Sequence, residues 1–536
     1  MVAIEVSWRW RLVRGDNGRS RSLVSCTQGL IRCAILAAAN SRRNGSSRHR
    51  ARCWHDAVNA DNNVSRSNMM KPYVTQLFLA TVLTSLAVPL SARVSEDLHL
   101  TATRTVEFAA SRAPSHRLLG RDQTPRGQRD GNWTSWRGPL GSGEAFGAPP
   151  TEWSEDKNIK WKTAIPGLGN STPIVWQDHL YLTTAIRTDE GGKAAGGGKG
   201  LGKVFDFRVI CIHRLDGSEV WNVSVTRSVP HEPVHGTASQ ASNSPVTDGK
   251  HIYAHFGSRG IFCLDMSGKQ IWSKQLGMMR INHQFGEGSS PALAGNALII
   301  NWDHDGDSFI CALNKKNGKQ LWRKPREEGT TWATPAITKA NGKTLAIVPA
   351  SGKSCAYNVK NGKIVWTASG LTANVIPSPI VRDGVAYLMS GYQGTVLQAI
   401  KLAGAKGDIT NRKNILWTHK RQTSYVPSAL LYGKHIYFLR RTSAVLSCLD
   451  MRTGAPVYEG QRLAGMRTIY ASPVGASGYV YLPSREGKTK VFKAGATYED
   501  VATNELDDQF DASPVIIGDD LYLRGHSSLY CVSEKN

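Results

Sequence analysis

The sequence contains one segment with the spacing of a zinc hydrolase site. Residues 231–235 (HEPVH) fit the HExxH pattern, in which two histidines on one helix face hold zinc and the glutamate lies beside the bound water. This chemistry requires a helix. Pro233 would remove a helical hydrogen bond inside that turn, and Pro230 stands just before the segment. We therefore expect a connecting loop here rather than a zinc site.

A second segment resembles a phosphate-binding loop in composition but not in spacing. Residues 191–200 (GGKAAGGGKG) are rich in glycine and lysine. A P-loop needs Ser or Thr directly after its lysine, and a glycine five positions before its second glycine. Gly200 follows Lys199, and Lys193 stands where the first glycine is needed. The segment is better explained as a surface loop.

A third group brings together carboxylates, imidazoles and an indole. Its members are His283, Gln284, Glu287, Trp302, Asp303, His304 and Asp305. Together with Asp307, the aspartates offer the hard oxygen atoms that calcium prefers, although the run 301–308 (NWDHDGDS) is also typical of a polar turn between strands. Two interpretations stay open: a ligand or cation site, or turn residues that satisfy one another. We assign no metal ligand.

These residues lie within a unit that recurs eight times along the chain. A small residue followed by proline, and then by a short alternating strand, marks each unit, and after a long first step the spacing is 41 to 50 residues. The marks are Thr172-Pro173, Ser244-Pro245, Ser290-Pro291, Thr334-Pro335, Ser378-Pro379, Ser428-Ala429, Ser472-Pro473 and Ser513-Pro514. Each unit offers short strands separated by glycine turns.

Four short strands per 40–50 residues make one blade of a β-propeller. We therefore expect an all-β fold, an eight-bladed propeller. The last unit, residues 511–532, stops before its fourth strand, and residues 158–162 (NIKWK) carry the missing pattern. The strand around Trp161 should join the C-terminal blade and close the ring, which removes exposed sheet edges.

Tryptophan and cysteine occupy fixed places in the repeat. Most units end their last strand on tryptophan, and we expect structural roles for Trp161, Trp221, Trp272, Trp322, Trp366 and Trp417. Cysteine fills one earlier slot, at Cys211, Cys263, Cys311, Cys355, Cys448 and Cys531. Equivalent slots in neighbouring blades lie too far apart for disulfides, so we expect six free, buried thiols.

The region before the repeats has the composition of a targeting segment followed by a linker. Residues 1–68 are Arg/Ser/Asn-rich and are interpreted as a disordered or mis-annotated extension. Residues 69–92 have the charged start, apolar run (74–88) and small-residue end of a secretory signal, or of an uncleaved membrane anchor. Residues 93–157 read as linker and residues 158–536 as the propeller. We expect an exported, periplasmic or envelope-associated protein.

Composition excludes several classes of protein. The chain is 40% hydrophobic with 15 Trp, which is too apolar for disorder throughout, and only one apolar run approaches the length of a membrane span. The net charge of +24 is drawn partly from the Arg-rich front. It points to no specific nucleic-acid motif.

The repeat resembles a known family. Residues 312–322 (ALNKKNGKQLW), 263–272 (CLDMSGKQIW) and 356–366 (AYNVKNGKIVW) are similar to the AxDxxTGxxxW repeat of quinoprotein-type propellers. The resemblance covers about residues 133–533. Together with the opening segment 133–143 (WTSWRGPLGSG), the repeats look like those of the secreted PQQ-like repeat proteins of planctomycete-type bacteria. A more distant relative is the propeller lipoprotein of outer-membrane protein assembly. The resemblance implies that each tryptophan docks on the adjacent blade.

For function, the sequence favours a non-enzymatic propeller that binds a protein, polymer or small ligand on one face. The candidate ligand site is His283, Glu287, Trp302, Asp303, His304 and Asp305. No cofactor is expected under this interpretation. The alternative is a periplasmic PQQ-dependent oxidoreductase that uses calcium. The family's dehydrogenases add a vicinal Cys-Cys disulfide, and the chain has no adjacent cysteine pair. A hydrolytic or lyase propeller lacks a paired carboxylate that the sequence can place.

Overall fold

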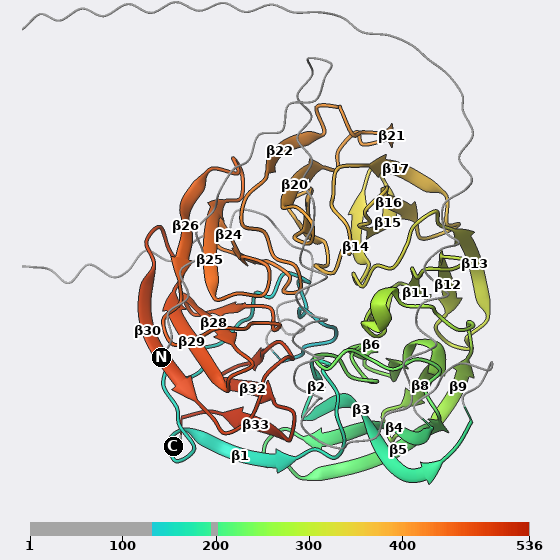
Figure 1. Cartoon of the computed structure of the whole chain (residues 1–536), viewed down its shortest axis with the longest axis vertical. Coiled ribbons are helices and arrows are strands. Elements are labelled where there is room, and N and C mark those ends of the chain that lie inside the picture. Colours follow the sequence, from blue (N-terminus) through green and yellow to red (C-terminus); the bar gives the residue numbers. More distant parts are fainter. Residues whose placement is uncertain (1–130, 194–201, 535–536) are drawn as a thin grey trace, which may run out of the picture. The chain divides into compact units, whose positions relative to one another are not determined.

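Each repeat unit folds into a four-stranded antiparallel sheet, and eight such sheets stand around one axis (Figure 1). The computed structural model describes residues 131–193 and 202–534. Residues 1–68 and 69–92, and the first part of the interpreted linker, lie outside the described residues. The all-β, eight-bladed fold predicted from the repeats is confirmed.

In blades 1 to 7 the strands run from the innermost to the outermost edge in chain order, and in blade 8 the outermost strand is β1 from the start of the propeller. Blade 1 contains β2 (Ile174–Trp176), β3 (His179–Gly191), β4 (Lys203–His213) and β5 (Glu219–Ser228), and blade 2 contains β6 (Val246–Thr247), β7 (His251–His255), β8 (Ile261–Asp265) and β9 (Gln270–Lys274). Blade 3 contains β10 (Ala292–Ala294), β11 (Ala297–Trp302), β12 (Phe309–Asn314) and β13 (Gln320–Pro325). Blade 4 contains β14 (Ala336–Ala340), β15 (Lys343–Val348), β16 (Ser354–Asn358) and β17 (Ile364–Ala368), with β21 (Gly407–Asp408) added in parallel.

The remaining four blades repeat this order. Blade 5 contains β18 (Ile380–Arg382), β19 (Val385–Ser390), β20 (Val396–Lys401) and β22 (Ile415–His419), and blade 6 contains β23 (Leu430–Tyr432), β24 (His435–Leu439), β25 (Val445–Asp450) and β26 (Pro456–Arg462). Blade 7 contains β27 (Val474–Ala476), β28 (Tyr479–Pro483), β29 (Lys488–Lys493) and β30 (Glu499–Glu505). Blade 8 contains β31 (Val515–Ile517), β32 (Asp520–Arg524), β33 (Ser528–Val532) and β1 (Ile159–Ala164). Within residues 131–193 and 202–534, two 3₁₀ turns occur between strands, η2 (Gly257–Arg259) and η3 (Asn282–Gln284).

Ring closure follows the prediction. In blade 8, β1 pairs antiparallel with β33, and Trp161 lies opposite Cys531. Figure 1 shows β1 beside β33 at the meeting of the two ends of the colour scale. Every blade therefore has four antiparallel strands, to which blade 4 adds the parallel strand β21, and hydrophobic cores fill the spaces between neighbouring blades. In one of them, Tyr253 of blade 2 packs in a cluster with Leu298 and Ile300 of blade 3.

Four of the six repeat tryptophans donate their indole N–H to the next blade, in agreement with the resemblance, whereas those of Trp366 and Trp417 are buried without a hydrogen-bond partner. The indole N–H of Trp161 donates to the Arg214 carbonyl (2.9 Å), and that of Trp221 donates to the Met266 carbonyl (3.1 Å). The ring of Trp161 also lies against Gly217, where a Cβ atom would approach it to 2.6 Å. Gly217 has a φ of +76°, so this turn needs glycine for its backbone as well as for the contact. Trp272 and Trp322 dock in the same way.

The six repeat cysteines are free and buried, as predicted. Burial raises the pKa of Cys211, Cys263, Cys311 and Cys448 to about 12, which keeps these thiols protonated at neutral pH. They act as small apolar side chains between the sheets.

The end of the interpreted linker packs against the propeller. Residues 131–145, here called the strap, cross one end of the central channel. The strap exchanges two backbone hydrogen bonds with Val175 of blade 1 through Trp133, and two with Gly475 of blade 7 through Gly143 and Ala145. Further along the chain, buried Trp153 stacks on Tyr481 before β1 begins. The buried tryptophans account for this packing despite the Gly/Pro/Ser-rich composition.

Candidate functional site

A hydrogen-bonded circle of hydroxyls surrounds the channel axis. It is built from the small residues that mark the repeat, and is here called the girdle: Thr172, Ser244, Ser290, Thr334, Ser378, Ser428, Ser472 and Ser513. In each blade the backbone N–H of the girdle residue donates to the girdle hydroxyl of the next blade, at distances from 2.8 to 3.1 Å. The Ser513 N–H donates to Thr172 Oγ1 and completes the circle.

A cavity of about 370 Å³ lies on the axis beside the girdle. Five girdle residues line it: Thr172, Ser244, Ser290, Ser472 and Ser513. The residue two positions before each girdle residue lines it as well, and these eight form what is here called the upper ring: Asn170, Ser242, Gly288, Trp332, Ile376, Val426, Tyr470 and Asp511. In an extended chain, positions i and i−2 face the same side, which is why every blade contributes in the same way.

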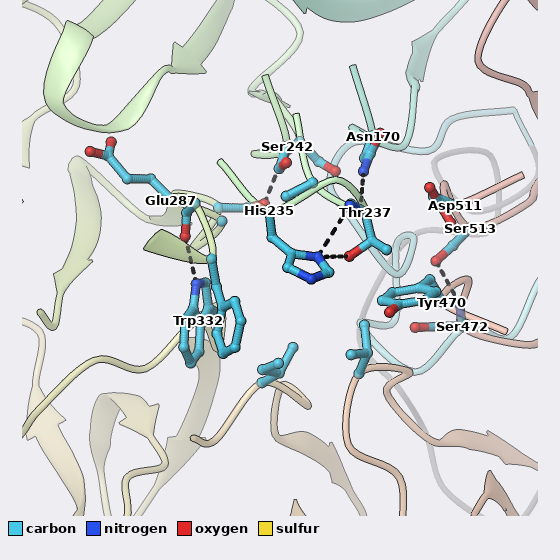
Figure 2. A pocket seen from close by; sticks show the side chains of 18 of the residues that line it. Asn170, His235, Thr237, Ser242, Glu287, Trp332, Tyr470, Ser472, Asp511 and Ser513 are labelled. Carbon is cyan, nitrogen blue, oxygen red and sulfur yellow. Dashed lines mark hydrogen bonds between the residues drawn. The ribbon is translucent and has the colours of Figure 1, made fainter. Parts of the chain in front are cut away.

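Aromatic side chains form a collar around the cavity. They are Phe285, Trp332, Tyr392, Tyr425 and Tyr470. The rings of Tyr392 and Tyr425 stack with their centroids 4.9 Å apart, and those of Phe285 and Trp332 lie 6.2 Å apart. Figure 2 shows Trp332 and Tyr470 on the opposite side of the group from Asn170 and Ser242. Four of these five rings are half-buried, and Trp332 is buried.

The cavity is closed on the side of the strap. Trp136 of the strap lines this cavity and also a second one, of about 310 Å³, between the strap and the inner strands of blades 2 to 5. Next to it, Arg137 is fully buried and donates to the carbonyls of Ala429 (3.0 Å) and Pro473 (2.8 Å). Desolvation lowers the pKa of Arg137 to about 9. Trp136 therefore stands between the two cavities at the strap end of the channel.

The HExxH-like segment forms a loop, and its two histidines have separate roles. His231 Nε2 lies 2.5 Å from the Met279 carbonyl, whereas His235 lines the cavity and contacts Thr237 Oγ1 through Nδ1 at 2.8 Å. Glu232 accepts the backbone N–H of Ile281 (3.1 Å). Among the described residues, no group of three or more His, Cys, Asp or Glu side chains is placed to hold a metal ion.

Asp303, the central member of the predicted polar cluster, is committed to a buried ion pair. Its two oxygens accept from Arg326 Nε (2.6 Å) and Nη2 (3.0 Å), and Thr331 Oγ1 donates to it at 2.6 Å. Both charged side chains are almost completely buried. The Arg326 guanidinium also donates to the Tyr357 hydroxyl. A bidentate pair of this kind leaves Asp303 little capacity to bind a ligand.

The neighbours of Asp303 are also engaged by protein groups. His304 Nδ1 accepts the Arg280 N–H (3.1 Å), and burial lowers the pKa of this histidine. Asp305 Oδ1 accepts from the N–H (3.1 Å) and the hydroxyl (2.7 Å) of Thr330. Trp302 is buried and stacks on Phe309.

The other half of the predicted cluster is divided between surface and cavity. His283 is exposed, with a φ of +50° inside η3. Glu287 lines the cavity, but its carboxylate accepts from the N–H and hydroxyl (2.6 Å) of Ser258. Figure 2 shows this carboxylate turned away from His235 and Thr237. Of the six predicted ligand residues, only Glu287 lines the cavity, and the role of the others in ligand binding stays a prediction.

The upper ring and collar were missed because their residue types vary from blade to blade. The signal that identifies them is positional, since each upper-ring residue stands two places before a girdle residue. Ranking residues by chemical type selects Asp303 and His304 and passes over Trp332 and Tyr470.

The donor set of the cavity does not fit PQQ, the cofactor of the dehydrogenases that share this fold. PQQ is a tricarboxylate, and its site must supply cationic partners. The charged lining residues apart from His235 are two acids, Glu287 and Asp511. The nearby Arg485 is already paired with Asp511, its Nε 3.0 Å from Oδ1.

An eight-bladed ring whose outer-strand tryptophans dock on the following blade defines a quinoprotein-type propeller. Residues 206–459 match the family model described as outer membrane protein assembly factor BamB. This match spans a little under half of the chain and agrees with the resemblance of the repeat to PQQ-like propellers. None of the curated proteins matches the chain significantly.

Solved structures of low sequence identity share the fold. A europium-containing methanol dehydrogenase is 10% identical, with a TM-score of 0.52, over 75% of this chain and 91% of that chain. A quinohemoprotein alcohol dehydrogenase from Pseudomonas putida HK5 is 12% identical, with a TM-score of 0.50, over 76% and 81%. BamB from Moraxella catarrhalis is 14% identical, with a TM-score of 0.44, over 65% and 99%. At these identities the likeness to the two dehydrogenases concerns the fold alone, and the likeness to BamB, at its lower TM-score, carries no argument.

Proposed function

We propose that the protein is an exported, non-enzymatic binding propeller whose ligand enters the cavity at one end of the central channel. The observation that carries this proposal is the cavity itself, whose lining combines a collar of five aromatic side chains with polar groups that are held in place by structural hydrogen bonds. Ligand sites are commonly concave and mostly apolar, with few oriented polar groups.

The location of the protein is part of the proposal. The predicted signal at residues 69–92 supports export, and so does the matched family, whose description names an outer membrane assembly factor. In the part of the chain that the structure describes, no helix is long and apolar enough to cross a bilayer.

The test is ligand-observed NMR with a mixture of small aromatic and cyclic fragments. The wild-type protein should show saturation transfer to some of them. Ala238 lines the cavity, and Ala238→Trp should fill it and abolish the transfer while the melting temperature changes little. Fragment binding that survives in Ala238→Trp, or is absent from the wild type, refutes the proposal.

The oxidoreductase alternative is tested separately. Incubation with PQQ and calcium should give neither a protein-bound quinone absorbance nor dye reduction with alcohols, because the cavity lacks cationic partners for the cofactor. Dye reduction that saturates with PQQ would favour the enzyme instead.

A further inference from the structure

The wall of the cavity is divided into a polar and an apolar half. Upper-ring residues of blades 8, 1 and 2 are polar: Asp511, Asn170 and Ser242. Those of blades 4 to 7 are apolar or aromatic: Trp332, Ile376, Val426 and Tyr470. The stacked pair Tyr392 and Tyr425 lies on the apolar half, and Thr237 on the polar half. A matching ligand has one apolar face and one polar edge.

The girdle supplies hydrogen-bond donors. Each girdle hydroxyl accepts the N–H of the preceding blade, and none of the five that line the cavity donates a hydrogen bond within the described part of the chain. A serine or threonine hydroxyl has one proton to donate and two lone pairs. The ring of hydroxyls therefore keeps donors available for the oxygen atoms of a ligand on the axis.

Charge in the cavity is balanced by the protein. Asp511 pairs with Arg485 and with His526 Nε2 (2.9 Å), and its side chain is only 3% exposed. Glu287 is held by Ser258. Neither acid is free to neutralise a cation, and His235 is the one basic side chain in this lining, with its Nδ1 engaged by Thr237. The cavity is suited to an uncharged ligand.

The depth of the cavity limits the part of a ligand that can enter. Trp136 stands between this cavity and the second one, which favours entry of a ligand from the face opposite the strap. A volume of about 370 Å³ is near the lower end of ligand pockets. The site can hold a small molecule or the end of a polymer.

We infer that the cavity binds a neutral saccharide, either free or as the terminal unit of a glycan chain. The inference rests on the proposed function. The C–H face of a sugar ring stacks on the aromatic half of the cavity, while its hydroxyl and ether oxygens meet the girdle donors and the polar half.

The experiment uses the folded protein on a glycan array that carries neutral termini, matched uronic-acid termini and amino-sugar termini, together with proline-rich peptides. Neutral termini should be retained. Calorimetry with the corresponding free disaccharides then separates terminal-unit binding from binding within a chain. Tyr425→Ala should weaken the affinity about tenfold through loss of the stacking face, whereas Tyr425→Phe should bind like the wild type.

Several outcomes would overturn the inference. One is retention of charged sugars or of proline-rich peptides in preference to neutral sugars. Another is binding of neutral sugars that is unaffected in Tyr425→Ala and in Ala238→Trp, which places the site elsewhere. If aromatic fragments bind the cavity but no neutral saccharide does, the saccharide inference fails while the proposed binding function stands.

Discussion

The girdle can be tested at Ser428, whose side chain is completely buried. Its Oγ accepts the N–H of Ser378 at 3.0 Å, and its own N–H donates to Ser472 Oγ at 2.9 Å. Ser428→Ala removes one acceptor and leaves the Ser378 N–H without a partner inside the protein. Leaving a buried donor unsatisfied costs about 1–3 kcal/mol.

This cost should be measurable despite the size of the propeller. Unfolding entropy is about 2.1 cal/mol/K per residue, which for about 400 folded residues gives about 0.8 kcal/mol/K. A loss of about 2 kcal/mol therefore lowers the melting temperature by about 2–3 °C. Calorimetry and urea unfolding measure the change, and hydrogen-exchange mass spectrometry should show faster exchange of the peptide that contains Ser378.

Two controls isolate the hydrogen bond. Ser428→Thr keeps the hydroxyl and should restore stability, since threonine fills the same position at Thr172 and Thr334. Ser447→Ala makes the same change in the same blade, at a buried serine whose Oγ accepts only a long contact of 3.4 Å from the Gly460 N–H. If Ser428→Ala costs less than about 0.5 kcal/mol, or no more than Ser447→Ala, then water replaces the lost acceptor and the girdle does not stabilise the ring.

Three further predictions concern packing and ionisation. Gly217→Ala places a methyl group 2.6 Å from the Trp161 ring and should lower the free energy of unfolding in urea. The loss should exceed by at least about 1 kcal/mol that of the control Gly342→Ala, where φ is +70° but no atom lies within 4 Å of the new methyl group. Equal losses would show that the docking contact contributes nothing. Burial raises the pKa of Cys311 from 9.0 to about 12, so this thiol should resist alkylation at pH 8. Because the thiol ionises first in the unfolded chain, the free energy of unfolding in urea should fall as the pH rises above about 9. Equal stability at about pH 8 and about pH 10.5 would contradict this prediction. Burial lowers the pKa of His255 from 6.5 to about 4, so the unfolded chain binds a proton first and the free energy of unfolding should fall as the pH drops through this range. The fall with pH should be less steep in His255→Asn. An equally steep fall in this variant would exclude His255 as the cause.

Repetition made the fold predictable from the sequence. The period gave eight units, and the incomplete last unit pointed to Trp161 as its missing strand. The strap was not foreseen, because its glycine- and proline-rich composition is that of a linker. Trp133 becomes a core residue only because its backbone pairs with Val175 of β2, a strand of the first repeat unit that follows about 40 residues later in the chain.

The candidate site was only partly predictable, since it depends on relations between distant residues. Asp303 has the chemistry of a ligand residue, but its charge is neutralised by Arg326. The sequence does not reveal this pair, because two strands, β12 and β13, separate the two residues along the chain. Trp332 and Tyr470 look like ordinary core residues in sequence. They face a cavity only because the closed ring brings the same position of every blade to one axis.

Closure by β1 also sets an order on folding. Trp161 and Cys531 are strand partners separated by most of the chain, and bringing such distant segments together is entropically costly and slow. The final sheet cannot form until its last strand has been synthesised, and until then the rows of unpaired backbone groups on both sides of the gap remain available to other chains. A protein built in this way gains from being kept unfolded, or held by a chaperone, until synthesis is complete.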